Sequence, residues 1–520
     1  MVVRGSGRFG SPAVACGELR DLWTAGRTTA ATWVRSPVVS TSPADLVTVP
    51  PAADDLGRLF EAAGHELHLV GGTVRDALLG RPATDLDFAT DARPDRVLAI
   101  VTGTAEATWT TGIDFGTVGI QFQGIRCEIT TFRADRYDRV SRNPLVQYGD
   151  TLEADLLRRD FTMNAMALSV PEHTFADPYG GLRDLATGAL RTPASPEESF
   201  ADDPLRMLRA ARFVAQLGVT PAAEVVAAMT AMAGEIARIT AERIQAELSK
   251  LLLGPYPRRG LELLVDSGLA DVILPELPAL RMEIDEHHQH KDVYAHTLTV
   301  LDQAIQLEPD GPDLVLRLAA LLHDIGKPAT RRHEPGGGVS FHHHEVVGAK
   351  LTRVRLRALR YPKELIENVA QLVALHLRFH GYGRGEWTDS AVRRYVNDAG
   401  PLLDRLHALV RSDCTTRNKR RAVALARSYD ALEERIARLQ EEEGLRAIRP
   451  DLDGNEIMRL LGISPGPLVG QAWRHLKELR LDRGPLDHDD AVAELYRWAR
   501  DRGLDVPPDG GAAGDTAETG

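Results

Sequence analysis

The stretch that most constrains the fold of this chain runs from Leu69 to Thr90, with the sequence LVGGTVRDALLGRPATDLDFAT. Its apolar start predicts a short strand, Gly71-Gly72 ends that strand, and the next residues have helical spacing up to Leu79. This order predicts backbone N–H groups at a helix N-terminus that face outward and bind anionic oxygens. Glycine lets a ligand approach closely there, and Arg75 supplies a planar guanidinium that suits a phosphate.

Two aspartates follow this turn. Asp85 and Asp87 alternate with Leu86 and Phe88, so a strand here presents both carboxylates on one face. Neighbouring carboxylates repel each other unless a cation lies between them. Oxygen ligands beside bound phosphates favour Mg²⁺. The sequence therefore predicts a magnesium and phosphate site, whereas a Gly-Gly turn or an aspartate pair on its own is usually only a turn or a strand end.

At this spacing, the two features resemble the GGxxRD…DxD signature of the class II tRNA nucleotidyltransferase and poly(A) polymerase family. The resemblance implies a polymerase-beta-like nucleotidyltransferase head. It also implies that Asp85 and Asp87 are catalytic and hold Mg²⁺, while Gly71, Gly72 and Arg75 bind the nucleotide.

Further motifs of the same family follow in the family's order. The run from Leu157 to Ala165, with a helix-like apolar part, resembles the RRDFTxNA motif, which implies Arg159 on phosphate and Asp160 on the ribose hydroxyls. Residues 177–185 match the DPxGGxxDL hinge between head and neck. Glu128, on a predicted strand, is either a third carboxylate ligand or a solvent-facing residue.

The neck motif begins at Asp202-Asp203. Either aspartate is a candidate N-cap, and the proline after them suits a first turn, so Asp203 and Arg206 are expected on one helical face. Cytosine and adenine each present an amino donor beside a ring-nitrogen acceptor, which a carboxylate and a guanidinium can pair with together. The alternative is a capped helix with a basic stripe. The run resembles the family's EDxxR motif, with Asp202 where Glu is usual, and implies a protein template in Asp203 and Arg206, with Arg209 and Arg212 reaching the triphosphate.

A second constellation lies in a region that is helical from about residue 260. Imidazole and carboxylate ligands from separate helices, His296, the pair His323-Asp324, and Asp413, predict a divalent-metal site. Their order, H…HDIGK…D, resembles the HD domain fused to some bacterial CCA-adding enzymes, which implies a phosphodiesterase or phosphatase activity. His344 and His376 either join a second metal or merely lie near the site.

The composition limits which binding partners are expected. A net charge of −12 argues against a protein that coats nucleic acid indiscriminately, so RNA contacts are expected from local basic faces. Three scattered cysteines predict neither a disulfide framework nor a zinc–thiolate site and fit a reducing cytoplasm. No membrane span, signal peptide or protein partner is inferred. The candidate basic faces are Arg353, Arg355, Arg357, Arg360 and Lys363, and Arg417, Lys419, Arg420 and Arg421.

The predicted fold class is α+β, with a small mixed sheet and helices in the head and an all-helical neck, HD region and tail. The predicted parts are a disordered extension (1–51), the nucleotidyltransferase head (52–192), the neck with the nucleotide-recognition motif (193–258), the HD domain (259–448), a helical tail (449–504) and a disordered end (505–520).

With the resemblance, these features predict template-independent addition of CCA to the 3′ end of tRNA from CTP and ATP, dependent on Mg²⁺, with a second divalent metal in the HD domain. The polar segment 133–153 corresponds to a loop that helps family members switch nucleotides, and its full length favours addition of A as well as C. The alternatives are a poly(A) polymerase, an HD phosphohydrolase with an inactive transferase head, and a non-catalytic RNA-binding protein. The acidic balance argues against the first and the intact motifs against the other two.

Overall fold

The computed structural model describes residues 42–506, apart from 83–84, 134–148, 150, 286–289, 336–337, 380–386, 417 and 444–448. It divides into two compact units, Met1–Pro278 and Ala279–Gly520. Most of the expected nucleotide-switching loop, and Arg417 of one basic face, lie outside the described residues. Within the described part of the chain, no helix is long and apolar enough to cross a membrane.

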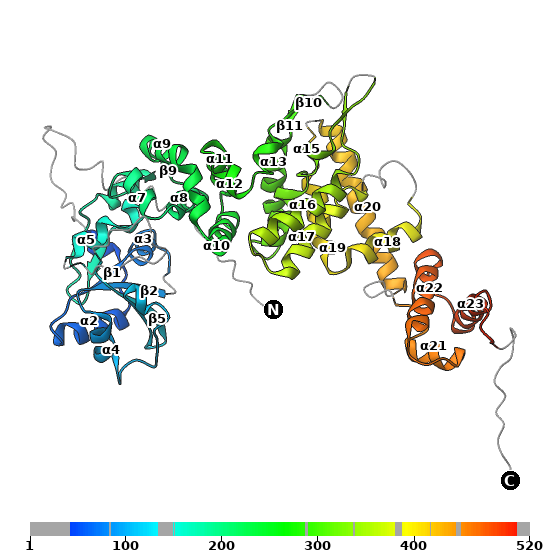
Figure 1. Cartoon of the computed structure of the whole chain (residues 1–520), viewed down its shortest axis with the longest axis horizontal. Helices are drawn as coiled ribbons and strands as arrows, with labels where there is room; N and C mark the ends of the chain where they lie inside the picture. Colours follow the sequence, from blue (N-terminus) through cyan, green and yellow to red (C-terminus); the bar gives the residue numbers. More distant parts are fainter. Residues whose placement is uncertain are drawn as a thin grey trace, which may run out of the picture. The chain divides into compact units, whose positions relative to one another are not determined.

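The first unit is built on a seven-stranded mixed sheet in the order β3-β4-β5-β2-β1-β6-β7 (Figure 1). β2 and β5 run parallel, and every other neighbouring pair in this sheet is antiparallel. The strands are β1 (Leu67–Val70), β2 (Asp85–Thr90), β3 (Ala107–Trp109), β4 (Thr117–Phe122), β5 (Ile125–Thr131), β6 (Ala167–Ser169) and β7 (Phe175–Ala176).

Helices α2 (Pro51–Ala62) and α4 (Pro94–Val101) lie on one side of this sheet (Figure 1). The strands alternate accordingly: in β2, Leu86 and Phe88 are buried, whereas Asp85 and Asp87 are exposed. The register of β2 therefore decides that its carboxylates stay on the open face. Just before α2, Pro43–Leu46 forms a 3₁₀ turn and Val47 is buried, so the last part of the expected disordered extension is folded.

The apolar run after Asp160 does not form the expected helix. It forms a 3₁₀ turn, Thr162–Asn164, and then leads into β6, because the strand adds to the free edge of β1. The remaining helices of this unit are α3 (Gly72–Leu78), α5 (Leu152–Leu157), α6 (Gly181–Thr187), α7 (Pro196–Asp202), α8 (Leu205–Leu217), α9 (Ala223–Met232), α10 (Ala241–Leu252), α11 (Pro257–Asp266) and α12 (Leu269–Ile273).

The second unit is mostly helical, with two small two-stranded sheets, β10 (Glu283–Asp285) with β11 (His290–Asp292) and β12 (Arg332–His333) with β13 (Val339–Ser340). α14 is the central helix: it is apolar and almost wholly buried, and it packs on α13, α17 and α19. Its helices up to residue 443 are α13 (Val293–Gln306), α14 (Leu314–Leu322), α15 (Lys327–Thr330), α16 (His344–Ala358), α17 (Lys363–Leu375), α18 (Asp389–Ala399), α19 (Leu403–Ser412) and α20 (Lys419–Glu443).

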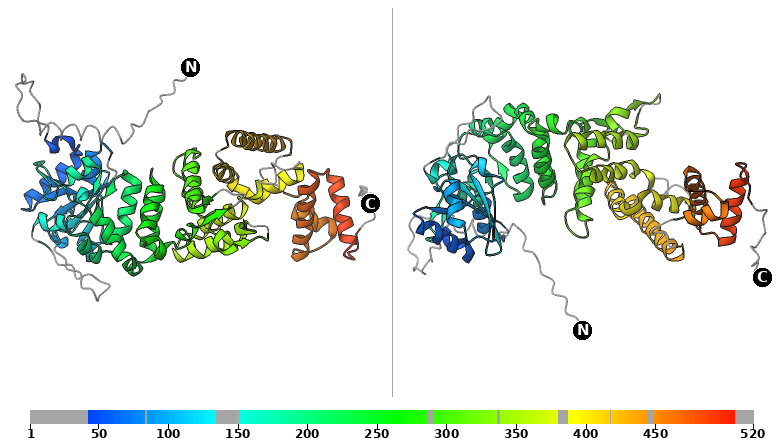
Figure 2. Two further views of the ribbon diagram at one scale, coloured as in Figure 1. Left: turned by 90° about the horizontal axis from the view of Figure 1, so that it is seen from above. Right: turned by 60° about the horizontal axis from the view of Figure 1, so that its bottom comes forward.

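The last three helices have a hydrophobic core of their own. α21 (Gly454–Leu461), α22 (Pro467–Arg483) and α23 (His488–Arg500) pack around Leu476 and Leu495, and form the orange-to-red bundle in Figure 2. The sequence placed the boundary between the neck and the HD domain after residue 258. Residues 258 and 259 both lie inside α11, and the two compact units divide after Pro278.

Candidate functional site

Three carboxylates line up across the open face of the head sheet. Asp85 and Asp87 both lie on the exposed face of β2, and strand pairing places Glu128 of β5 directly beside Asp87. Loss of water around Asp87 raises its pKa to about 6, and the negative charges of Glu128 and Asp85 add to this rise. The oxygen donors and their mutual repulsion fit a hard divalent cation, which would relieve that repulsion.

Two arginines converge on the glycine turn beside these carboxylates. Gly71 has φ +67°, and a Cβ atom there would lie 2.9 Å from Nη1 of Arg159. A Cβ atom on Gly72 would lie 3.6 Å from Nη2 of Arg75. The positive charges of both arginines also lower the pKa of Asp87, although less than burial and Glu128 raise it. The turn therefore combines open backbone with two guanidinium groups, a combination that suits phosphate oxygens.

Asp160, expected on the ribose, is engaged by protein groups. Its Oδ1 accepts hydrogen bonds from the backbone of Phe161 (2.8 Å) and from Asn164 (2.8 Å), and its Oδ2 accepts one from Arg209 (2.5 Å). Burial alone would raise the pKa of Asp160, but the charge of Arg209, the hydrogen bonds from Asn164 and Arg209 and the charge of Arg206 together outweigh it and hold the pKa below its usual range. Arg75 in turn donates to Asn164 (2.6 Å). Contacts from Arg75 through Asn164 and Asp160 to Arg209 therefore join the glycine turn to neck helix α8.

The two outer arginines of α8 are held by a buried acid. Arg212 donates to Glu247 of α10 over 2.5 Å and lies 3.9 Å from the ring centroid of Phe213. Arg209 lies 3.6 Å from the other oxygen of Glu247. In this conformation Arg212 is neutralised by Glu247, and Arg209 by Asp160 and Glu247, so protein acids engage both groups that the resemblance assigned to a triphosphate.

The expectation that Asp203 and Arg206 share one helical face is wrong. Asp202 ends α7, and Asp203 is extended between α7 and α8, because a residue before proline avoids helical geometry. Asp203 accepts from the backbone of Leu205 (3.1 Å) and pairs with Arg243 of α10 (2.7 Å). Arg206 donates to Ser199 Oγ (2.8 Å) and to the carbonyl of Arg158 (2.6 Å). Each member of the expected template pair therefore has its own partners.

Four further residues support this site and were not singled out from the sequence. Thr73 accepts a hydrogen bond from the backbone of Asp87 (3.0 Å), which fixes the turn against the carboxylate strand. Asn164 bridges Arg75 and Asp160, Arg243 holds Asp203, and Glu247 holds Arg209 and Arg212. Thr73 and Asn164 lie within the motif stretches already quoted. Arg243 and Glu247 look like ordinary polar residues of an amphipathic helix, and the burial of Glu247 reveals its role.

The second unit brings the HD residues together as two groups of three. His296, His323 and Asp413 form one group, and Asp324, His344 and His376 form the other; within each group the candidate ligand atoms lie within 4.8 Å of one another. The His296 and Asp413 side chains approach to 3.0 Å, and Asp324 lies 3.3 Å from His344. His344 and His376 therefore belong to the cluster itself.

All four imidazoles are held by Nδ1. His323, His344 and His376 contact backbone carbonyls through Nδ1 at 2.7–2.8 Å, and His296 contacts Thr415 Oγ1 at 3.0 Å. Among the described residues, Nε2 of His376 has no hydrogen-bond partner, whereas Nε2 of His323 and of His344 lies 3.2 and 3.3 Å from Asp324. Nε2 atoms aimed inward, with Nδ1 fixed behind them, are the usual arrangement of metal-binding histidines.

The charges in this cluster fit bound cations. Burial lowers the pKa of His376 to about 3, so this imidazole is neutral and can donate its lone pair. Burial also opposes the charge on His323, but Asp324 and Asp413 beside it outweigh burial and raise its pKa to about 9. A divalent cation would replace that proton. Gly326 permits the close packing, since a Cβ atom there would lie 2.1 Å from the carbonyl oxygen of His344.

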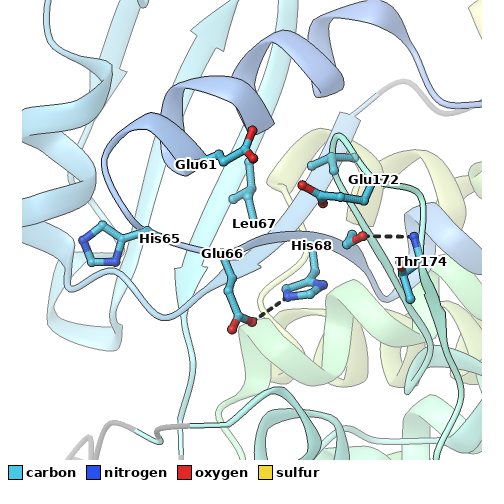
Figure 3. Close-up of a pocket in the computed structure, with 9 residues that line it drawn as sticks. Glu61, His65, Glu66, Leu67, His68, Glu172 and Thr174 are labelled. Carbon is cyan, nitrogen blue, oxygen red and sulfur yellow. Dashed lines mark hydrogen bonds and ion pairs between the residues drawn. The ribbon is translucent and has the colours of Figure 1, made fainter.

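One hollow of about 370 Å³ lies away from these centres (Figure 3). Leu67 and His68, at the start of β1, line it, whereas the glycine turn follows the other end of that strand. Its histidines have acidic partners: His68 lies 3.0 Å from Glu66, and His65 lies 3.1 Å from Asp91. The glycine turn and the carboxylate row therefore lie outside this hollow.

Comparison with known proteins matches three parts of the chain. The Poly A polymerase head domain matches residues 67–191, the probable RNA and SrmB-binding site of polymerase A matches 218–280, and the HD domain matches 293–417. The chain is 36% identical to the A-adding tRNA nucleotidyltransferase of Deinococcus radiodurans, over 83% of this chain and 95% of that protein. It is 34% identical to the CC-adding tRNA nucleotidyltransferase of Thermus thermophilus, over 82% and 93%.

A solved structure gives the same result. The CCA-adding enzyme of Bacillus stearothermophilus in complex with CTP superposes with a TM-score of 0.63 and 26% identity, covering 88% of this chain and 99% of that one. The alignment covers nearly the whole of both chains. The chain belongs to the family of tRNA nucleotidyltransferases that includes the A-adding, CC-adding and CCA-adding enzymes.

Proposed function

We propose that this protein adds CCA to the 3′ end of tRNA, using CTP and ATP and releasing pyrophosphate. One observation carries the proposal: the row of Asp85, Asp87 and Glu128 lies beside a glycine turn faced by two arginines, and contacts through Asn164 and Asp160 connect that turn to the neck. Such a row suits metal-assisted nucleotidyl transfer, and its continuity with the neck suits an enzyme that chooses among bases without a nucleic-acid template.

In this proposal Asp85 and Asp87 hold Mg²⁺. When bound, the ion lowers the pKa of the attacking 3′-hydroxyl and stabilises the leaving pyrophosphate oxygen. Arg75 and Arg159 bind the triphosphate beside the turn and keep it in line with the attacking oxygen. Glu128 completes the negative face that attracts the cation. Two guanidinium groups are needed beside the turn because they offset the negative charge that the triphosphate brings next to three carboxylates.

Base choice is assigned to Asp203 and Arg206. A carboxylate and a guanidinium together match the donor and acceptor of cytosine or adenine and leave both groups unsatisfied with uracil or guanine. Because Asp203 is paired with Arg243 and Arg206 with Ser199 and Arg158, both must turn part of their hydrogen-bonding capacity toward the incoming base. Arg243 then holds Asp203 in place.

The test is to incubate the purified protein with Mg²⁺, tRNA lacking its 3′ end and each labelled nucleotide in turn. We expect two cytidines to be added from CTP alone, and one adenosine to follow from ATP only after both cytidines. Addition of cytidines alone would identify a CC-adding enzyme, addition of adenosine to tRNA that already ends in CC without any addition of cytidine would identify an A-adding enzyme, and a long ladder from ATP would identify a poly(A) polymerase. Each of these three results would overturn the proposal.

A second activity is favoured by the HD cluster. The two groups of imidazoles and carboxylates, each with its candidate ligand atoms within 4.8 Å of one another, fit bound cations, and paired cations beside carboxylates hydrolyse phosphate esters. Replacing His323 and Asp324 together should abolish ring opening of 2′,3′-cyclic phosphates or release of phosphate from terminal phosphates, while CCA addition continues. Asp85→Ala is the matched control, with the opposite result in both assays; loss of both activities in the double variant would make the cluster structural.

A further inference from the structure

Trp109 lies on the same face of the head sheet as the carboxylates. In β3 it is paired with Gly119 of β4, Gly119 is paired with Glu128 of β5, and Glu128 with Asp87 of β2. Paired residues on neighbouring strands point to the same face. One row therefore crosses four strands and leads from an indole ring to the proposed metal ligands.

The indole lies flat enough on the sheet to need glycine beneath it. A Cβ atom on Gly119 would lie 1.8 Å from Nε1 of Trp109 and 2.2 Å from Cε2. Glycine inside a strand weakens the strand and often marks the close approach of another group. Here the approaching group is Trp109, so its ring occupies the surface between β3 and the carboxylates.

Arg126 places a positive charge between the ring and the metal ligands. Its guanidinium carbon lies 5.2 Å from the ring centroid of Trp109, and its Nη2 lies 3.0 Å from Glu128. Asp85 is its neighbour on β2. An indole placed only to fill a core would lie on the apolar face with Leu86 and Cys127, whereas Trp109 is half-buried on the charged face.

The strand order decides which substrate reaches this surface. The glycine turn follows β1, on one side of β2, and β5, β4 and β3 lie on the other side. In nucleotidyl transfer, the attacking and leaving oxygens lie on opposite sides of the phosphorus. If the leaving pyrophosphate is held at the turn, the attacking 3′-hydroxyl of the RNA arrives from the side of β5.

We infer that Trp109, steadied by Arg126, is a stacking platform for a base at the 3′ end of the RNA, an inference that rests on the proposed transferase function. Strands lie about 4.8 Å apart, so a ring over β4 is roughly 10 Å from Asp87. Stacked bases rise by about 3.4 Å each, which places the platform under one of the last three nucleotides. Single-stranded RNA ends are bound by stacking on aromatic rings beside a guanidinium.

The test combines a protein change with an RNA change in the full-length chain. The RNA is tRNA lacking CCA, either intact or with the base removed at one of its last three positions. Base stacking on an aromatic ring contributes about 5- to 100-fold, so we expect Trp109→Ala to lower kcat/KM for intact tRNA by about tenfold, with KM for CTP unchanged within about twofold. One of the base-free RNAs lacks the base that stacks on Trp109. On that RNA, Trp109→Ala should lower kcat/KM little further, because the stacking contact is already absent.

Two further variants separate contact from folding. Trp109→Phe keeps an aromatic ring and should retain activity on intact tRNA within about threefold. Gly119→Ala should displace the ring and behave like Trp109→Ala, but should have no further effect in the Trp109→Ala background. Urea unfolding of each variant reports any general loss of stability. If the effects of Trp109→Ala and of base removal on kcat/KM simply multiply at all three RNA positions, the inference is overturned. A KM for CTP that rises together with the KM for tRNA would also overturn it.

A measurement of tRNA binding without catalysis tests the stacking platform separately from the proposed transferase function. Fluorescence anisotropy of labelled tRNA, measured without Mg²⁺ and nucleotide, should show about tenfold weaker binding to Trp109→Ala than to the wild type, and equal binding of the base-free RNA to both. If the wild type binds in this way but adds no nucleotide, the transferase function fails and the platform stands. If it adds nucleotides without any coupling in binding or rate, the platform fails alone.

Discussion

The head and the second unit place carboxylates in opposite settings. In the head, Asp85 and Asp87 stand on an exposed strand face, and the proposed ion would be completed by oxygens of the substrate. In the second unit, His323, Asp324 and His376 are fully buried, and six candidate ligands come from the protein itself. The first setting suits an ion that arrives with each nucleotide, and the second suits ions that stay.

The supporting contacts differ in the same way. The carboxylate strand is held by its own backbone pairing and by one hydroxyl, that of Thr73. Each imidazole of the HD cluster is fixed separately through Nδ1, three by backbone carbonyls and one by Thr415. We therefore expect the head site to depend on charge and the HD site to depend on geometry, and the following predictions test this difference.

The largest effect is expected at Asp85. Asp85→Ala should lower the rate of nucleotide incorporation by a factor on the order of 10⁴, because the metal supplies several kcal/mol of transition-state stabilisation. The urea midpoint should stay the same or rise, since the variant removes a charge that repels Asp87 and Glu128. Asp95→Asn, an exposed acid of α4, is the control with unchanged activity. Retained incorporation in Asp85→Ala would disprove the metal assignment.

Asp203→Ala should change selectivity more than speed with the correct bases. Without the carboxylate, uracil no longer meets an unmatched, half-buried acceptor, and discrimination against UTP and GTP should relax by a factor on the order of 10³. The measurement is the ratio of kcat/KM for CTP and UTP on tRNA lacking CCA. Glu197→Gln, an exposed acid of α7, should leave the ratio unaltered. An unaltered ratio in Asp203→Ala would exclude the protein template.

The sequence predicted local geometry well where one strand or turn decides it. The alternation at Asp85 and Asp87 and the glycine turn both follow from neighbours in the chain. It failed at Asp203, because the residue before Pro204 is extended and lies outside α8, whereas the spacing placed it with Arg206 on one helical face. Contacts such as those of Glu247 with Arg209 and Arg212 join helices far apart in the sequence, so no local pattern marks them.

His376→Ala should affect the HD cluster alone. It removes a neutral, buried ligand of one group and leaves His296, His323 and Asp413 in place. Elemental analysis after dialysis should show two ions per wild-type chain and one per variant chain, since losing a ligand weakens binding by about 100-fold or more. The rate of CCA addition should remain within about twofold of the wild type. A wild-type protein that emerges from dialysis without metal would contradict the view that these ions stay.

The smallest effect comes from exchanging one hydroxyl for a methyl group in each centre. Thr415→Val removes the contact to Nδ1 of His296, which should weaken metal binding in that group by about tenfold, because such contacts orient the ligand. Thr73→Val removes the acceptor for the Asp87 backbone N–H, which should cost about 1–3 kcal/mol of stability. It should barely change the Mg²⁺ concentration that gives half-maximal incorporation, since the nucleotide brings most of the ligands. A larger metal defect in Thr73→Val than in Thr415→Val would reverse the contrast between a site built on charge and a site built on geometry.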